Sequence, residues 1–360
     1  MKVGVDGRSL VGGGGRGVAH YTSALLGALV ETFPEDEWRV LLPRGPVHGL
    51  ARGVTVVRSQ WPGRLLWGAA AALGRPRLDA LLGGGLDVVW APAPAPLAVG
   101  RGVPLVLTVH DRSWEQRPGD FTAYERLWHA AARPRALARE AARVLCDAEA
   151  VRADLVTAWG LDPARVRAVP LAPAIDAGRG QTPRFSSDSK GSDPYFLFVG
   201  ALEPRKAPEV LLAAHAEARR AGLAAELWFA GEGRVAVGGE GVRRLGRAGD
   251  AELPALYAGA LALVLPSRLE GFGLPPVEAL AHGTPAIVSD LPVFRETLGP
   301  EGALYVPPGD TRALAAALLR LERERGLRDR LVAAGRAATA GLSWAATARA
   351  TRAVLAEAAG

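Results

Sequence analysis

The sequence predicts an α/β protein made of two doubly wound, Rossmann-like domains. Short apolar runs alternate with amphipathic stretches along most of the chain. This alternation is typical of parallel strands that are buried on both faces and connected by helices. The chain has 360 residues, which is long for a single hydrophobic core. The alternation also stops once, near the middle, and then restarts.

The first half of the chain predicts six strands. Residues 1–6 form the first, and a glycine-rich turn at 11–17 and a helix at 21–33 follow it. The other strands are expected at residues 38–43, 86–92, 103–111, 142–148 and 166–173. We assign these elements to an N-terminal domain of residues 1–175.

A polar segment, DAGRGQTPRFSSDSKGSD, separates the two halves. It is rich in Gly and Ser and has no periodicity, so we expect residues 176–194 to be a linker. The domain at 195–342 is then predicted to have strands at 195–201, 225–231, 261–267, 285–290 and 303–308, and helices at 208–222, 250–260 and 275–283. Residues 343–360 predict a last helix, with Ser343 as N-cap, that packs back toward the N-terminal domain.

The composition restricts the class of protein. Cys146 is the single cysteine, so no intrachain disulfide forms, which fits a reducing compartment. Residues 1–10 lack a signal-peptide core, and no run approaches the ~20 apolar residues that span a bilayer. We therefore expect a cytoplasmic protein. The net charge of +6 favours anionic partners and allows a peripheral contact with the inner membrane face. No basic cluster interleaved with aromatic residues predicts nucleic-acid binding.

The stretch SRLEGFGLPPVEALAHGTP holds two glutamates, Glu270 and Glu278, with seven residues between them. The stretch runs from the end of a buried strand through a glycine turn into a helix. Open α/β sheets bind ligands at this edge, and glycines there let a phosphate approach the backbone. A carboxylate can accept two hydrogen bonds from vicinal hydroxyls, as on ribose or a sugar ring. Taken alone, either glutamate could instead be a solvated turn residue or a helix-stabilising charge.

Two cations follow the strand at 195–201. Arg205 and Lys206 lie where the next helix starts. A guanidinium and an ammonium together suit a diphosphate, although an exposed loop pair is the alternative interpretation.

Other patterns predict little chemistry. Gly12, Gly14 and Gly17 match G-x-G-x-x-G, but the strand at 38–43 is not followed by the acidic residue of an NAD site. No cluster of Asp and His predicts a metal site. We expect His215 and Cys146 to be structural. The aromatic pair Trp61 and Trp67 could belong to the core, to an acceptor wall or to a membrane-facing patch.

Several motifs follow one another along the chain in a characteristic order. FVGALEPRK, LWFAGEG, LPSRLEGFGLPPVEALAHGTPAIVSD and ALYVPPGD follow one another over residues 195–345, and GVAHY, DVVWAP and LVLTVHD precede them. This order resembles the retaining family 4 glycosyltransferases of the GT-B fold, and among them the mannosyltransferases. The resemblance implies an interdomain cleft, with an acceptor-binding N-terminal domain and a C-terminal domain that binds a nucleotide sugar.

The resemblance also implies roles for individual residues. Glu278 would hold the ribose and Glu270 the transferred sugar. Arg205 and Lys206 would hold the diphosphate and stabilise the leaving group. The remaining implied contacts with sugar or phosphate are Phe272, Gly273 and Leu274 in the glycine turn, Gly17 in a glycine loop, and His110 near the donor sugar. No metal and no cofactor would be needed, because the cations replace a divalent ion. Ala207 and His20 depart from the family pattern, which usually has Asn and Arg there.

The expected activity is therefore the transfer of a hexose to a hydroxyl of a glycan or a lipid-linked acceptor. Mannose from GDP-mannose is the first expectation, and a UDP-sugar is the second. Two alternatives remain open at this point: a sugar-nucleotide epimerase on the same fold, and a non-catalytic nucleotide-sugar-binding protein.

Overall fold

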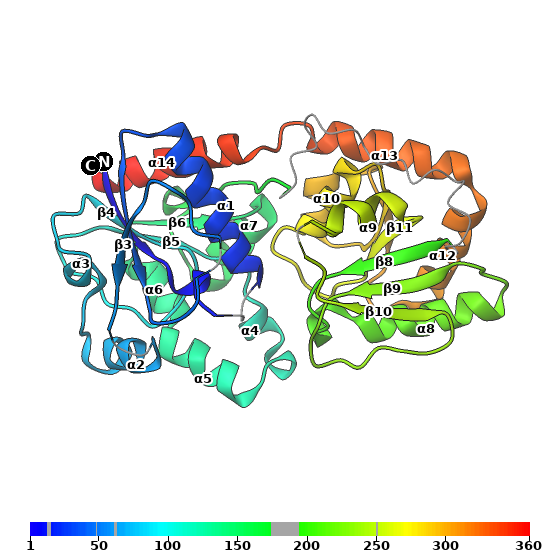
Figure 1. The fold of residues 1–360 in the computed structure, drawn as a ribbon, viewed down its shortest axis with the longest axis horizontal. Helices are drawn as coiled ribbons and strands as arrows, with labels where there is room; N and C mark the ends of the chain where they lie inside the picture. The colour runs from blue at the N-terminus through cyan, green and yellow to red at the C-terminus, as the bar shows by residue number, and fades with distance from the viewer. Residues whose placement is uncertain (13–15, 48, 61–62, 174–193, 250) are drawn as a thin grey trace. The chain divides into compact units, whose positions relative to one another are not determined.

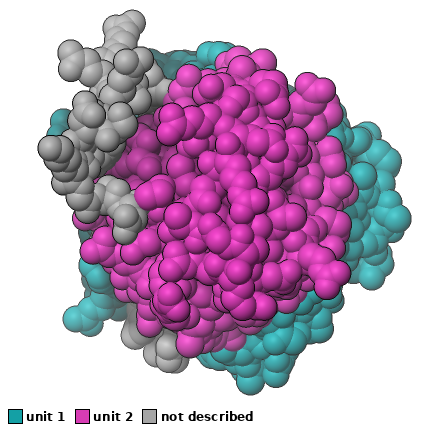
Figure 2. Space-filling model, turned by 90° about the vertical axis from the view of Figure 1, so that its right-hand side faces the viewer, with its two compact units in different colours: residues 1–171, 342–360 teal, residues 172–341 magenta. Residues whose placement is uncertain are grey.

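The computed structural model describes residues 1–360 except 13–15, 48, 61–62, 174–193 and 250. Contacts divide the chain into two compact units, unit 1 with residues 1–171 and 342–360 and unit 2 with residues 172–341. Figure 2 colours the two units separately. Each unit has the predicted α/β architecture with a parallel sheet (Figure 1). The expected linker lies outside the described residues except for Pro194.

The described part of unit 1 contains a seven-stranded parallel sheet in the order β3-β2-β1-β4-β5-β6-β7. The strands are β1 (Lys2–Asp6), β2 (Glu37–Leu42), β3 (Thr55–Arg58), β4 (Val88–Ala91), β5 (Leu105–Thr108), β6 (Arg143–Cys146) and β7 (Val166–Ala168). The central strands β4 and β5 are buried at every residue. That burial accounts for their uninterrupted apolar sequence.

Helices cover the sheet of unit 1. They are α1 (Arg16–Thr32), α2 (Gly63–Leu73), α3 (Leu78–Leu81), α4 (Ser113–Gln116), α5 (Ala123–Ala132), α6 (Pro134–Glu140), α7 (Glu149–Trp159) and α14 (Trp344–Ala359), with short 3-10 turns at Arg8–Leu10, Pro118–Asp120 and Pro163–Arg165. The C-terminal helix α14 packs against α1, as Figure 1 shows. Ser343 accepts a hydrogen bond from the backbone of Ala346 and so caps α14. The hydroxyl of Thr347 donates to the carbonyl of Pro170 at 2.8 Å and fastens α14 to the end of the sheet.

The described part of unit 2 contains a six-stranded parallel sheet in the order β10-β9-β8-β11-β12-β13. The strands are β8 (Tyr195–Val199), β9 (Glu226–Ala230), β10 (Val242–Gly246), β11 (Ala262–Leu265), β12 (Ala286–Ser289) and β13 (Leu304–Val306). The helices are α8 (Pro208–Arg220), α9 (Leu253–Gly259), α10 (Leu274–Ala281), α11 (Pro292–Leu298), α12 (Thr311–Arg323) and α13 (Arg325–Thr339), with a 3-10 turn at Pro204–Lys206. Tyr195, Leu197 and Leu263 on the sheet and Tyr257 on α9 share one hydrophobic cluster.

Sequence patterns did not predict β3 and β10, which each lie at one edge of their sheet. Residues of β3 are mostly exposed, and those of β10 are exposed or half-buried. An edge strand that is not covered on both faces needs no apolar run, so the pattern that identified the central strands is missing here. The described helices include none with both the length and the apolar composition to cross a bilayer.

Candidate functional site

The sheet of unit 2 reverses its strand order between β8 and β11. These two strands are parallel neighbours, but from β8 the chain continues to β9 on one side and from β11 to β12 on the other. The loops that follow them, residues 200–207 and 266–273, therefore leave the same sheet edge in opposite directions. Ligands of open α/β sheets bind at such a point. All of the predicted diphosphate and sugar contacts of unit 2 lie on these two loops or at the start of α10.

Arg205, Lys206 and Glu270 meet at this edge. The Lys206 ammonium donates a hydrogen bond to Oε1 of Glu270, and Nη1 of Arg205 lies 3.9 Å from Oε2. The hydroxyl of Ser267 also donates to Oε1, at 2.6 Å. Lys206 and the Glu270 side chain are both largely buried, at 8% and 6% exposed. Two cations share one carboxylate, so this edge retains a net positive charge that suits an anionic ligand.

Arg268 holds the two loops together. Its backbone N–H donates to the carbonyl of Arg205 at 2.8 Å, and its guanidinium donates to the carbonyl of Pro204 at 2.6 Å. The same guanidinium forms an ion pair with Glu209, at 2.6 Å. The loop that carries Arg205 is therefore fixed to the loop that carries Glu270, which preorganises the charged groups.

The turn from Phe272 to Leu274 has a backbone that requires glycine at its centre. Gly273 has φ of +90°, and a Cβ there would lie 2.3 Å from the ring of Phe294. Phe272 is buried and its carbonyl accepts a hydrogen bond from the Thr297 hydroxyl at 3.5 Å. Leu274 is the first residue of α10. The helix thus begins one residue before the predicted range of 275–283.

Glu278 lies in the second turn of α10, and it is 7% exposed. The hydroxyl of Tyr257, which is fully buried, donates to Oε2 of Glu278 at 2.7 Å. Burial and the carboxylate of Glu278 raise the pKa of Tyr257 well above its ordinary value, so the phenol stays protonated and remains a donor. Oε1 of Glu278 accepts no hydrogen bond from the described residues. One oxygen is held by the protein and the other can accept from a ligand.

His110 belongs to a separate cluster in unit 1. It follows β5, and Asp147 follows the neighbouring strand β6. Nδ1 of His110 lies 2.7 Å from Oδ2 of Asp147, and Nε2 lies 3.0 Å from the carbonyl of Pro92. Burial alone would lower the pKa of His110, but the Asp147 carboxylate and its hydrogen bond outweigh burial and raise it. Both ring nitrogens face acceptors, so the His110–Asp147 pair holds a proton between its members.

Gly17 lies in α1, not in the predicted glycine loop. It is the second residue of that helix, and a Cβ there would meet nothing within 4 Å. Tyr21, one helical turn further along α1, packs edge-on against His110 with ring centroids 4.7 Å apart. The backbone of Gly17 shows no positive φ. Neither its conformation nor its packing therefore requires glycine.

The other residues that the sequence singled out either fit a structural role or lie outside the described part of the chain. Trp67 is buried and the guanidinium of Arg8 lies over its ring at 3.6 Å, which fits the core interpretation. Cys146 is a buried free thiol, and Nε2 of the buried His215 lies 3.0 Å from the carbonyl of Ala225. Trp61 and Gly14 lie outside the described residues. Within the described ranges no three His, Cys, Asp or Glu side chains come together as metal ligands.

Three residues of the site were missed at the level of sequence. Asp147 directly follows a buried strand and Ser267 lies two residues past another, and these positions were a signal that could have identified them. Tyr257 had no such signal, because an aromatic residue in an amphipathic helix usually belongs to the core.

Two family descriptions match the chain. The family described as "Glycosyl transferases group 1" matches residues 181–338, and the one described as "Glycosyltransferase Family 4" matches residues 13–173. Together they cover most of both units.

Individual relatives agree with these matches. The chain is 54% identical over 72 residues to the O-antigen chain mannosyltransferase RfbU of Salmonella typhimurium, covering 20% of each chain. It is 41% identical over 159 residues to the phosphatidyl-myo-inositol mannosyltransferase of Mycobacterium leprae, covering 41% of this chain and 42% of that one. The chain thus matches less than half the length of either protein.

A solved structure matches the whole chain. HepE of Anabaena, crystallised with UDP and glucose, has a TM-score of 0.73 over 99% of this chain and 100% of its own, at 16% identity. At that identity the likeness concerns the fold.

Proposed function

The chain belongs to the family 4 glycosyltransferases of the GT-B fold, and from this premise we propose that it is a retaining glycosyltransferase that uses a nucleotide sugar. The observation that carries the proposal is the charged cluster at the switch point of unit 2. Arg205 and Lys206 face one carboxylate, Glu270, on loops that Arg268 fixes in place. A diphosphate beside this cluster would meet two cations, of which Arg205 can bind as a fork and Lys206 as a point charge.

In the proposed reaction the bond between the anomeric carbon and the donor diphosphate breaks. A hydroxyl of the acceptor attacks that carbon from the same face, and its proton passes to an oxygen of the departing diphosphate. Arg205 and Lys206 stabilise the negative charge that develops on the leaving group, which is the electrostatic contribution that usually dominates. The protein cations serve in place of a divalent ion, so metal independence is part of the proposal.

Glu278 is proposed to bind the ribose of the donor. Tyr257 fixes Oε2 of the carboxylate, so Oε1 is directed toward the ligand and can accept from a ribose hydroxyl. Glu270 is proposed to accept hydrogen bonds from the transferred sugar as Lys206 turns from it toward the diphosphate. The backbone of Phe272, Gly273 and Leu274 is proposed to lie along the sugar and phosphate.

His110 is proposed to contact the transferred sugar. Its Nε2 is within hydrogen-bond distance of the Pro92 carbonyl, so a contact with a sugar hydroxyl would replace that bond. Asp147 would keep the imidazole oriented through Nδ1. Gly17 is proposed to lie near the donor phosphates, where the lack of a side chain leaves room.

Mannose from GDP-mannose remains the proposed donor, and the named mannosyltransferases of Salmonella typhimurium and Mycobacterium leprae support it. The UDP and glucose bound to HepE keep a UDP-hexose as the second choice. The acceptor is proposed to be a glycan or lipid-linked hydroxyl, reached in the cytoplasm with a peripheral contact at the inner membrane face. The epimerase and the non-catalytic binding protein are not favoured, because the matched families are transferases.

The test is to incubate the full chain with GDP-mannose, UDP-glucose or UDP-N-acetylglucosamine and follow the released or transferred sugar by NMR. We expect one donor to be consumed and its sugar to appear first with the donor's own anomeric configuration. Arg205→Ala with Lys206→Ala should lower turnover at least about a hundredfold, since loss of one transition-state donor alone costs that much. Arg325→Ala with Arg330→Ala removes two exposed charges from α13 of the same unit and should leave turnover unchanged. An inverted product would contradict the retaining mechanism.

A further inference from the structure

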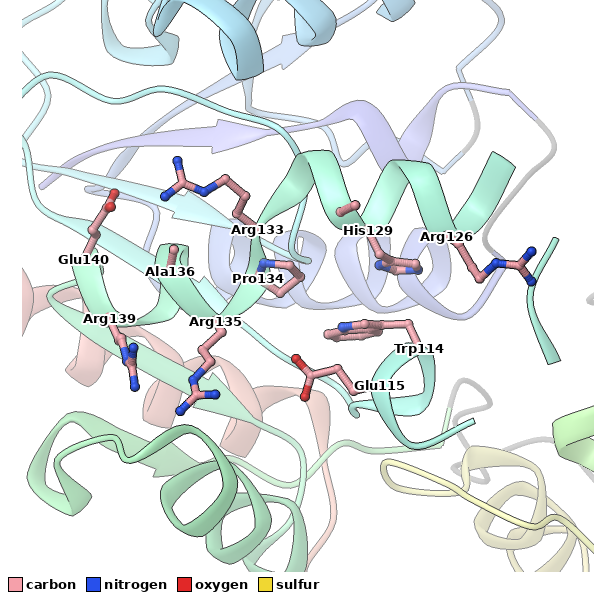
Figure 3. Close-up of a pocket in the computed structure, with 11 residues that line it drawn as sticks. Trp114, Glu115, Arg126, His129, Arg133, Pro134, Arg135, Ala136, Arg139 and Glu140 are labelled. Carbon is pink, nitrogen blue, oxygen red and sulfur yellow. The ribbon is translucent and has the colours of Figure 1, made fainter. Parts of the chain in front are cut away.

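Unit 1 also contains a cavity that is lined by none of the residues assigned to the candidate site so far. It lies among α4, α5 and α6 and has a volume of about 670 Å³ (Figure 3). This size falls within the range of small-molecule sites, roughly 300–1,000 Å³. Both aromatic and cationic side chains line it.

Four arginines line the cavity, against two glutamates: Arg126, Arg133, Arg135 and Arg139 against Glu115 and Glu140. The carboxylate of Glu115 already accepts from Nη1 of Arg112 and from Nε1 of Trp159, both at 2.8 Å. Its charge is thereby compensated from outside the cavity lining. The cavity therefore retains an excess of positive charge.

None of these four guanidinium groups has a carboxylate partner among the described residues. Arg126 donates to the carbonyl of Phe121 at 2.7 Å, and Arg139 donates to the carbonyl of Trp159 at 2.9 Å. A carbonyl accepts the hydrogen bond but leaves the positive charge in place. The side chains of Arg133 and Arg135 are exposed and make neither an ion pair nor a hydrogen bond within the described part of the chain.

This arrangement is unfavourable for the folded chain by itself. Arg135 and Arg139 lie one turn apart on α6, and their side chains extend to the same side of it in Figure 3. Like charges at this spacing destabilise a helix. Arg133, at the junction of α5 and α6, has φ of +45°, a conformation that non-glycine residues rarely adopt. Local conflicts of this kind are typical of binding sites.

One wall of the cavity is flat and aromatic. The rings of Trp114 and His129 stack face to face (Figure 3), and their centroids are 4.6 Å apart with an angle of 11° between the planes. Burial lowers the pKa of His129, so the ring adds no charge at neutral pH. The cavity thus offers an uncharged aromatic surface beside guanidinium groups, which suits an anionic group attached to an organic body.

The cavity lies close to His110 along the chain and in the fold. Helix α4, which carries Trp114 and Glu115, begins three residues after His110. The carboxylate of Asp111, between them, accepts from the backbone N–H of Ser113 at 2.8 Å. The cavity and the His110 cluster therefore adjoin the same end of strand β5.

We propose that this cavity binds the phosphate or diphosphate group of a phosphorylated acceptor. The inference rests on the proposed function, because it names the class of the second substrate. Arginines bind phosphate oxygens through paired N–H groups, and Arg133 and Arg135 have those groups unengaged. The group could belong to a lipid-linked diphosphate or to a soluble phosphate ester, which share this chemistry.

The test uses calorimetry on the full chain carrying Arg205→Ala and Lys206→Ala, so that a diphosphate cannot report on unit 2. Inorganic pyrophosphate and geranyl diphosphate are the probes. Adding Arg133→Ser and Arg135→Ser should weaken binding at least about tenfold, the loss expected for charge-assisted hydrogen bonds. The control pair Arg52→Ser and Arg101→Ser removes two exposed arginines elsewhere in unit 1 and should change affinity less than about twofold.

The two probes distinguish the source of the phosphate. Tighter binding of geranyl diphosphate supports a lipid-linked acceptor, and equal binding supports a soluble phosphate ester. No binding of either probe, or equal weakening by the control pair, would overturn the proposal. So would binding confined to phosphatidylglycerol vesicles, which would indicate a membrane surface instead. A nucleotide titration of the unmodified chain keeps the two proposals separable. If the unmodified chain binds nucleotide but the probes do not bind, the cavity proposal is rejected and the proposed function is not.

Discussion

Tyr257 is the single residue whose effect on the candidate donor site follows most directly from its contacts. It is fully buried, and its hydroxyl donates to Glu278. A carboxylate held by one fixed donor presents its other oxygen in a fixed direction. By orienting Glu278, Tyr257 would determine how well the candidate site distinguishes a ribose from a deoxy sugar.

We therefore expect Tyr257→Phe to reduce the preference for a ribonucleotide over its 2′,3′-dideoxy analogue. The ring is kept, so packing changes little, while the oriented hydrogen bond is lost at a cost of about 1.5–3 kcal/mol. Calorimetry with GDP and dideoxy-GDP measures the preference. Tyr195→Phe is the matched control, because that hydroxyl donates to the carbonyl of Leu256 at 2.8 Å in the same hydrophobic cluster. An equal loss of preference in both variants would assign the effect to general destabilisation.

His110 and Asp147 give a prediction about pH. The pKa of His110 is raised, since Asp147 and its hydrogen bond outweigh burial. The pKa of His110 in the unfolded chain is about 6.5, so the charged pair contributes its full stabilisation of the folded chain below that pH. This contribution is lost as the pH rises through the raised pKa of His110 in the folded chain. Burial also raises the pKa of Asp147, so this carboxylate becomes protonated in acid and the ion pair with His110 is then lost.

Asp147→Asn should accordingly destabilise the chain more at pH 6 than at pH 9. Urea denaturation of the wild type and the variant at both pH values measures the difference. A destabilisation that is the same at both pH values would mean that the raised pKa of His110 does not contribute to folding.

At the scale of elements, the turn between β11 and α10 depends on Gly273. Its φ of +90° and the 2.3 Å approach of a Cβ to Phe294 combine backbone strain with a clash. Gly273→Ala should lower the free energy of unfolding by about 2–4 kcal/mol and weaken nucleotide binding. Gly309→Ala is the control, since Gly309 has φ of +80° but nothing within 4 Å of its Cβ position. If the two variants were equally stable, the contact with Phe294 would not matter.

The same element shows which features a sequence can predict. A buried strand, a glycine turn and a helix were expected over residues 261–283, and all three are present. The start of the helix was placed at Pro275, whereas it begins at Leu274. Proline is tolerated throughout the first helical turn, so its position does not fix the first residue. The edge strands β3 and β10 were missed because their residues lack the burial that produces apolar runs.

At the scale of the whole molecule, charge and fold class were predictable, and the partners of site residues were not. The alternation of apolar runs predicted two parallel sheets, and the positions of Arg205, Lys206 and Glu270 after strands predicted their common sheet edge. The ion pairs among them depend on which strands are neighbours, and strand order is not contained in local periodicity. The carboxylate beside His110 was missed for the same reason, since β5 and β6 are adjacent only in the folded sheet.

The central claim is that the β8–β11 edge of unit 2 binds a nucleotide sugar without a metal ion. The most direct measurement is a thermal-shift screen of the full chain against GDP, UDP, ADP and their sugar conjugates, with and without EDTA. A ligand that binds the folded chain raises its melting temperature by mass action. We predict a shift with one nucleotide family that is insensitive to EDTA and is lost in Glu278→Ala. No shift with any nucleotide, or a shift that EDTA abolishes, would contradict the claim.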